Sequence, residues 1–325
     1  MATTSRLSRV RERLTLPTVR RATGMLDGRH RSVFIGHGQD FDDLSEYRPG
    51  DDITDIDWKA SARTGSPVIK RYQRESNLPL VLVVDTGRTM TAQSPTGESK
   101  AELALFVADV FAYLARLRGD TVALVAGDSS RLLQRPPRAG SEHAETLLRQ
   151  LERALSPADG GVSPAGRVAG PPSPTRGPGP GRTLPPSDVA RLLDRVLTWH
   201  RRRSLVVLVT DETRPGPDCE DPLRKLSAMH ELIVIQVADD LAVRPGAGPA
   251  RDVDAAAELP AFLREDVTLA AEIADRAEAR RREVAHILDR RHVEHVTVTG
   301  ADTLVDALAD LLRRQRRVTA AGRRR

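Results

Sequence analysis

Short, almost wholly apolar runs recur along this chain, separated by longer stretches of mixed polarity. The clearest runs are residues 80–85, 121–127, 204–211 and 231–239, each of the length of a β-strand. A strand that is apolar at nearly every position is typical of a sheet with both faces covered. We therefore expect these runs to be buried strands, with residues 130–135 and 295–300 as further short strands.

Helices are predicted between these strands. They comprise residues 102–118, 141–155, 187–203, 221–230, 266–291 and 301–317. Ser141 and Ser187 precede two of them and are expected to be N-caps. Strands that alternate with helices predict an α/β fold, here a doubly wound, mostly parallel sheet flanked by helices.

The first quarter of the chain has a different pattern. Residues 28–79 are rich in turn residues, and short strands fit around 32–35 and 68–72, so we expect a small β-rich extension there. The predicted organisation is a basic segment 1–27 with a short amphipathic helix within 5–24, the β-rich region 28–79, an α/β domain 80–318 and a basic tail 319–325. A flexible Pro/Gly-rich insertion, residues 156–182, interrupts the α/β domain.

The composition limits which residues can form the core and which kinds of site the protein can have. Only 3% of the residues are aromatic, against 39% hydrophobic in total, so Ala, Val and Leu must build the core. The lone Cys219 excludes an internal disulfide framework and a cysteine-based zinc site. No apolar run approaches the ~20 residues of a membrane span, and the start has no apolar leader, so we expect a soluble, cytoplasmic protein.

Candidate chemistry gathers where the predicted strands end. Asp85 and Asp211 each end an apolar run, Thr89 follows the first, and Thr183 precedes a predicted helix. Sites in open α/β sheets form at the carboxyl ends of the strands, so these four side chains are expected to converge. All-oxygen donors of this kind suit Mg²⁺ or Mn²⁺.

This layout resembles the von Willebrand factor A-type domain, whose metal-ion-dependent adhesion site has an Asp-x-Ser-x-Ser loop, a distal Thr and a later Asp. The resemblance implies that Asp85, Thr89, Thr183 and Asp211 take those places. The chain departs from the pattern at Gly87, where the family has Ser. With one hydroxyl ligand missing, and Arg88 beside it, a divalent cation is expected to bind more weakly or not at all.

A second resemblance covers the block before residue 80. Its signature segments are Asp40–Phe41, Glu46–Asp52, Ile56–Trp58 and Ser61–Arg63. They look like the signature of the bacterial family called domain of unknown function 58, which joins it to an A-type domain. Family members are often associated with MoxR-type AAA+ ATPases. The resemblance therefore implies a partner or adaptor of such an ATPase in complex assembly or metallo-enzyme maturation.

Two roles are open for the charged and aromatic side chains of this signature: Tyr47, Arg48, Asp51, Asp52, Asp57, Trp58 and Arg63. Trp, Tyr and Arg dominate binding hot spots, so the block could be a partner surface. Alternatively the aromatic and arginine side chains tie the N-terminal strands to the A-type domain, with the acids forming ion pairs and turn caps.

Three functions follow from these patterns. The first is a non-enzymatic interaction module acting with a MoxR-type ATPase. The second is a Mg²⁺-dependent hydrolase or phosphotransferase with Asp85 as nucleophile or ligand, against which stands the lack of a second carboxylate in its loop. The third is nucleic-acid binding through the arginine-rich ends, which lack interleaved aromatic residues for base stacking.

Overall fold

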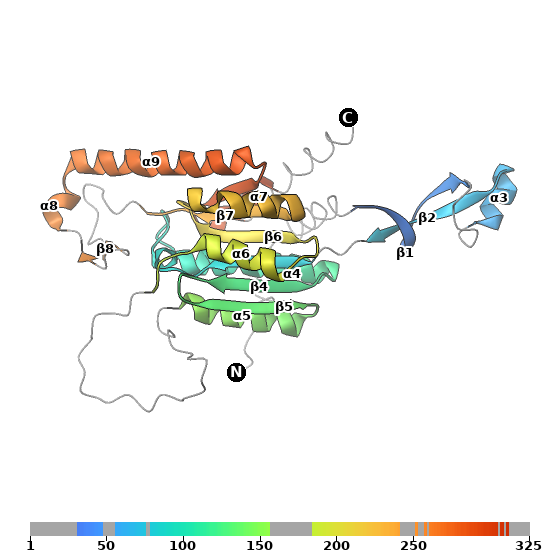
Figure 1. The fold of residues 1–325 in the computed structure, drawn as a ribbon, viewed down its shortest axis with the longest axis horizontal. Helices are drawn as coiled ribbons and strands as arrows, with labels where there is room; N and C mark the ends of the chain where they lie inside the picture. Colours follow the sequence, from blue (N-terminus) through green and yellow to red (C-terminus); the bar gives the residue numbers. More distant parts are fainter. Residues whose placement is uncertain are drawn as a thin grey trace, which may run out of the picture.

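A six-stranded sheet forms the centre of this computed structural model (Figure 1). The structure describes residues 31–47, 56–75, 79–156, 184–240, 251–252, 257–258, 260–304, 306–308 and 310–311. The strands of the sheet are β3 (Leu80–Asp85), β4 (Val122–Gly127), β5 (Leu132–Arg138), β6 (Leu205–Asp211), β7 (Glu231–Val237) and β10 (Glu294–Val298).

The strand order is β10-β7-β6-β3-β4-β5, and only β5 runs antiparallel to its neighbour. Counted in chain order from β3, this is the 3-2-1-4-5-6 arrangement of doubly wound sheets. The predicted fold class is therefore confirmed. The order reverses between β3 and β6, which makes the carboxyl ends of these two strands the switch point of the sheet.

Helices cover both faces of the sheet because the central strands are apolar on both sides. Leu82 and Val84 face one layer, formed by α4 (Lys100–Arg118), α5 (Ser141–Leu155) and the helical residues around Leu304 and Leu308. Val81 and Val83 face the other layer. It consists of α6 (Val189–Trp199), α7 (Glu220–Met229) and α9 (Val267–Arg290).

The N-terminal extension is a two-stranded antiparallel sheet of β1 (Arg31–Glu46) and β2 (Val68–Glu75), with the short helix α3 (Trp58–Thr64) between them in the chain. Both strands are longer than the sequence predicted. Figure 1 shows this unit at one end of the molecule, whereas the loops after β3 and β6 lie at the other end.

Two predicted helix caps are wrong. Ser141 is the first residue of α5 and follows Gly140, and Asp188 rather than Ser187 caps α6 by accepting a hydrogen bond from the Arg191 N–H. The helix expected within 5–24, the basic tail and almost all of the 156–182 insertion lie outside the described residues. Within the part that is described, no helix is long and apolar enough to cross a membrane.

Candidate functional site

Asp85 and Asp211 end the two strands at the switch point, as the sequence predicted. β3 and β6 pair in parallel, so both acids lie at the same edge of the sheet. Their side chains are almost wholly buried, with exposed fractions of 0% and 1%. Two carboxylates removed from water at one edge need compensation from their neighbours.

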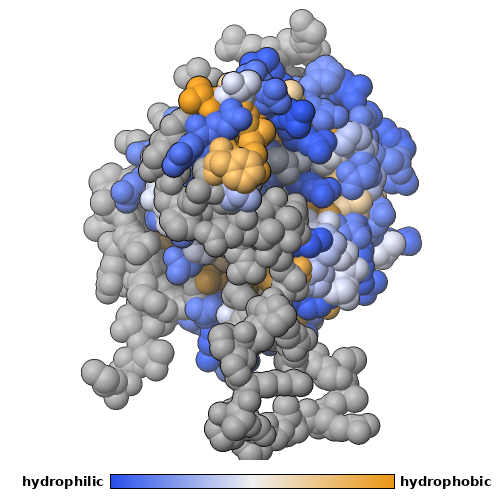
Figure 2. Space-filling view, turned by 90° about the vertical axis from the view of Figure 1, so that its left-hand side faces the viewer, coloured by the Kyte–Doolittle hydropathy of each residue, from blue (hydrophilic) through white to orange (hydrophobic). Residues whose placement is uncertain are grey.

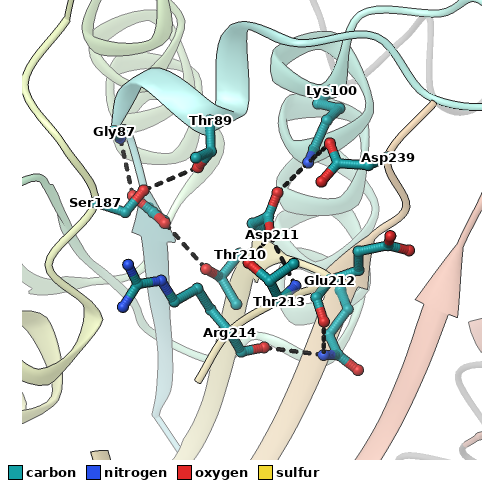
Figure 3. A network of polar contacts seen from close by, with 12 residues as sticks. Gly87, Thr89, Lys100, Ser187, Thr210, Asp211, Glu212, Thr213, Arg214 and Asp239 are labelled. Atoms are coloured by element: carbon teal, nitrogen blue, oxygen red, sulfur yellow. Dashed lines mark hydrogen bonds and ion pairs between the residues drawn. The ribbon is translucent and has the colours of Figure 1, made fainter. Parts of the chain in front are cut away.

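Asp85 accepts hydrogen bonds from three residues, Gly87, Thr210 and Ser187, which are labelled in Figure 3. The Gly87 N–H donates to Oδ1 at 2.8 Å and the Thr210 hydroxyl donates to Oδ2 at 3.0 Å. The Ser187 hydroxyl is the third donor. Burial raises the pKa of the Asp85 carboxyl, the charge of Asp211 adds to that effect, and the three hydrogen bonds oppose it.

Thr89 also reaches this site, and its partner is Ser187. The two hydroxyls lie 3.0 Å apart. Thr183, the predicted distal hydroxyl, lies outside the described residues. Ser187 was missed as a site residue because its place before a helix indicated an N-cap. The Arg88 N–H donates to the Pro185 carbonyl at 2.9 Å, which brings the segment before α6 against the loop after β3.

Asp211 has a cation as its neighbour. Lys100, the first residue of α4, is wholly buried, and its Nζ contacts Asp211 Oδ2 and lies 2.5 Å from Asp239 Oδ1. Burial alone would lower the pKa of Lys100, but the two carboxylates raise it above its ordinary value. Burial tends to raise the pKa of Asp211, and the Lys100 charge outweighs that and lowers it.

Asp239 completes this charged cluster, and 29% of its side chain is exposed. Burial and the neighbouring Asp211 raise the pKa of Asp239 to about 7, against the opposing effect of Lys100. The Lys100 ammonium group therefore lies between two carboxyl groups whose pKa values are shifted in opposite directions. The sequence pattern did not indicate that Lys100 joins these acids, since it lies 111 and 139 residues before its two partners.

The loop after β6 is fixed in the same region. Asp211 Oδ1 accepts hydrogen bonds from the Thr213 N–H at 2.7 Å and from its hydroxyl at 2.5 Å. From β7, the Gln236 side-chain amide donates to the carbonyls of Glu212 and Arg214 at 3.0 and 2.9 Å. All oxygens of Asp85 and Asp211 thus have partners within the protein.

These residues do not fit the divalent cation that the A-type pattern implies. A Cβ added at Gly87 would lie 2.6 Å from Ser187 Cα, so the missing hydroxyl ligand has no room. The later acid, Asp211, is bound to an ammonium group instead. Among the described residues, no group of three or more His, Cys, Asp or Glu side chains is placed to hold a metal ion.

The described signature residues lie in the N-terminal unit. Asp57 is the N-cap of α3 and accepts from the N–H groups of Lys59 and Ala60, both at 3.0 Å, as the turn-cap interpretation predicted. The exposed Arg63 donates to the Lys59 carbonyl of its own helix. The Tyr47 N–H donates to the Pro67 carbonyl at 2.9 Å. Arg48, Asp51 and Asp52 lie outside the described residues.

Trp58 is different, because 69% of its side chain is exposed. A tryptophan that tied two parts of the chain together would be largely covered. For Trp58 the structure therefore contradicts the interpretation as an internal tie.

Comparison with known families agrees with this organisation. A model of the family described as "Protein of unknown function DUF58" matches residues 43–284, more than half of the chain. The chain therefore belongs to the DUF58 family. The match includes part of the N-terminal unit as well as most of the six-stranded sheet.

Individual relatives are more distant. The uncharacterized proteins Rv1480 of Mycobacterium tuberculosis and Mb1516 of Mycobacterium bovis are each 28% identical over 276 residues, which cover 85% of this chain and 79% of the relative. Similar solved structures include BatB from Bacteroides thetaiotaomicron, at 12% identity and a TM-score of 0.42 over 73% of this chain and 98% of that one. A von Willebrand factor type A protein from Catenulispora acidiphila has 11% identity and a TM-score of 0.38 over 74% of this chain and 43% of that one.

Proposed function

We propose that this protein is a non-enzymatic interaction module that acts as partner or adaptor of a MoxR-type AAA+ ATPase in complex assembly or protein maturation. Membership of the DUF58 family supports the proposal, since the signature resemblance implies such an ATPase partner. The observation that carries it is the exposed Trp58 in the signature region.

Trp58 has the properties of a binding anchor. It is the first residue of α3, whose N-terminus is fixed by Asp57 and whose C-terminus is closed by Gly65 in a left-handed conformation. The indole is thus presented on a helix fixed at both ends rather than on a loop. Tryptophan is one of the three residue types, with Tyr and Arg, that are enriched among the side chains that dominate binding energy at protein interfaces.

The strand-end acids support a non-enzymatic role. A general base or a carboxylate nucleophile needs an oxygen that can reach a substrate. Asp85 and Asp211 are buried, and each is hydrogen-bonded by neighbouring residues. The hydrolase alternative stays a prediction that phosphatase assays on wild type and Asp85→Asn would test. Turnover lost in that variant would favour it over an interaction module.

The interaction is tested by affinity capture from the native cell extract, with identification of the bound proteins by mass spectrometry. Wild type, Trp58→Ala and Phe262→Ala are compared. Phe262 is a matched control because it is equally exposed, at 72%, and lies on α8 (Ala261–Arg264), outside the signature. Figure 2 looks onto the end of the molecule where α8 lies, and shows an apolar patch bordered by hydrophilic side chains among the coloured residues.

We expect wild type and Phe262→Ala to capture a MoxR-type ATPase and Trp58→Ala to lose it. An ATPase captured equally by all three proteins would show that Trp58 is not the anchor. A wild-type capture without any AAA+ ATPase would contradict the proposed partner.

A further inference from the structure

The buried ammonium group of Lys100 is the most unusual feature of the switch point. Its side chain has an exposed fraction of 0%, and a lysine is almost never fully buried unless it is paired. It is also the first residue of α4, where the helix dipole disfavours a positive charge. Strong compensation must therefore come from its two carboxylate partners, Asp211 and Asp239.

The position of this ammonium group matters as much as its burial. Asp211 ends β6, and Asp239 follows two residues after the end of β7. Asp85 ends the neighbouring β3, close enough for the charge of Asp211 to affect its pKa. Lys100 thus holds its positive charge among the acids at the carboxyl edge of the sheet, where the A-type resemblance implies a divalent cation.

Gly87 also prevents the loop after β3 from supplying a metal ligand at this position. In the A-type pattern a serine at this position supplies a ligand. Here Ser187 approaches so closely that a Cβ on residue 87 would lie 2.5 Å from its backbone nitrogen. Backbone atoms cannot move aside as the end of a flexible side chain can. The absence of a ligand side chain is therefore part of how the loop after β3 packs against the segment before α6.

We propose that the Lys100 ammonium group is the built-in cation of this site and replaces a bound divalent metal. Its contacts to Asp211 and Asp239 hold the loops after β6 and β7 to the start of α4 without any metal. Asp85, Thr89 and Ser187 form a separate hydrogen-bonded group beside it. The inference concerns the cation alone and does not depend on which partner the protein binds.

The first test is direct metal binding by the purified full chain. Mn²⁺ is titrated in the millimolar range and free Mn²⁺ is followed by electron paramagnetic resonance, with the melting temperature measured in EDTA and in Mg²⁺. We expect no stoichiometric Mn²⁺ binding and the same melting temperature in both buffers. Stoichiometric binding to wild type that disappears in Asp85→Asn would overturn the proposal.

The second test removes the ammonium group. Lys100→Ala leaves the carboxylates of Asp211 and Asp239 without their cation and opens space beside them. We expect this variant to melt at a lower temperature than wild type and to recover part of the loss in Mn²⁺ or Mg²⁺. Lys225→Ala is the matched control, because Lys225 pairs with Asp221 on the surface.

A folded Lys100→Ala protein whose melting temperature is unchanged would also overturn the proposal, since removal of a built-in cation must lower the stability of the fold. If that variant does not fold, the wild-type Mn²⁺ titration decides by itself. Neither measurement involves a partner protein, so their failure and the failure of the proposed ATPase interaction are distinguishable.

Discussion

At the scale of single residues, Gly87 shows how closely two loops approach at the switch point. It directly precedes the short 3-10 helix Arg88–Thr91, and its N–H donates to Asp85. The Ser187 backbone lies directly over its Cα, in the space a side chain would need. Its conformation is extended, with φ of −67° and ψ of 168°, so steric contact and not backbone strain requires a glycine here.

Restoring the serine of the A-type pattern is therefore expected to damage the fold rather than to create a metal site. Gly87→Ser should lower the free energy of unfolding by about 1–3 kcal/mol, the usual cost of inserting atoms into a packed region. Urea denaturation with and without Mg²⁺ measures this. Gly87→Ala is the control, because it adds the Cβ without the hydroxyl and should lose a similar amount. Rescue by Mg²⁺ of the serine variant alone would contradict the account.

Which residues form the site could be predicted only in part. Asp85 and Asp211 were predictable because each follows an apolar run whose end is plain in the sequence. Ser187 was not, since its neighbour Asp188 is an equally good helix cap and only the path of the chain decides between them. Lys100 gave no signal, because its partners lie 111 and 139 residues further along the chain.

At the scale of elements, the ends of α6 and α7 bring two histidines together. His200 and His230 follow the last residues of these helices, are 8% and 4% exposed, and have ring centroids 6.1 Å apart. His200 Nε2 lies 2.6 Å from the Ser204 hydroxyl, and both ring nitrogens of His230 are buried. Burial lowers the pKa of both rings. The charge of Arg202 lowers the pKa of His200 further, and at His230 the neighbouring His200 ring also lowers the pKa, against a hydrogen bond with the His200 backbone that raises it.

This arrangement predicts a loss of stability in mild acid. The unfolded chain takes up a proton on His230 as the pH falls through 6.5, while the lowered pKa keeps the folded ring neutral. The contribution of His230 to stability is therefore fully present above pH 6.5 and is lost below it, by up to about 1.4 kcal/mol per pH unit. His230→Leu should lose less stability than wild type between about pH 7.5 and about pH 5.5.

Urea denaturation at the two pH values measures that difference. The exposed His286 of α9 gives the control, since His286→Leu should follow wild type. Asp239 acts in the opposite sense. Because its pKa is raised, its contribution to the free energy of unfolding falls as the pH rises toward 7. This effect is common to all three proteins and cancels in the comparison. Equal losses in wild type and His230→Leu would contradict the assignment to His230.

The elements themselves were predictable to different degrees. β3 has the bounds that its apolar run predicted, because a strand buried on both faces leaves no ambiguity. β5 begins two residues and ends three residues later than predicted, since an edge strand with mixed polarity has no sharp ends. β1 and β2 extend well past their predicted bounds, because their ends are defined by backbone pairing with each other, which the hydrophobic pattern does not show.

At the scale of the whole molecule, the two candidate regions lie at opposite ends (Figure 1). The switch point, with its buried acids and Lys100, is closed by internal contacts. The N-terminal unit exposes Trp58. We therefore expect a partner to bind at the signature region and the cluster around Lys100 to stabilise the fold, so that mutations in the two regions have separable effects.

The most direct test of the central claim is the affinity of the purified protein for the purified MoxR-type ATPase of the same organism. Because such ATPases need Mg²⁺ with their nucleotide, the metal is kept and variants carry the comparison. We predict that Trp58→Ala weakens binding by about 2 kcal/mol or more, about thirtyfold, whereas Phe262→Ala and Asp85→Asn bind as wild type does. Binding that survives Trp58→Ala and is lost in Asp85→Asn would contradict the account and place the interface at the switch point.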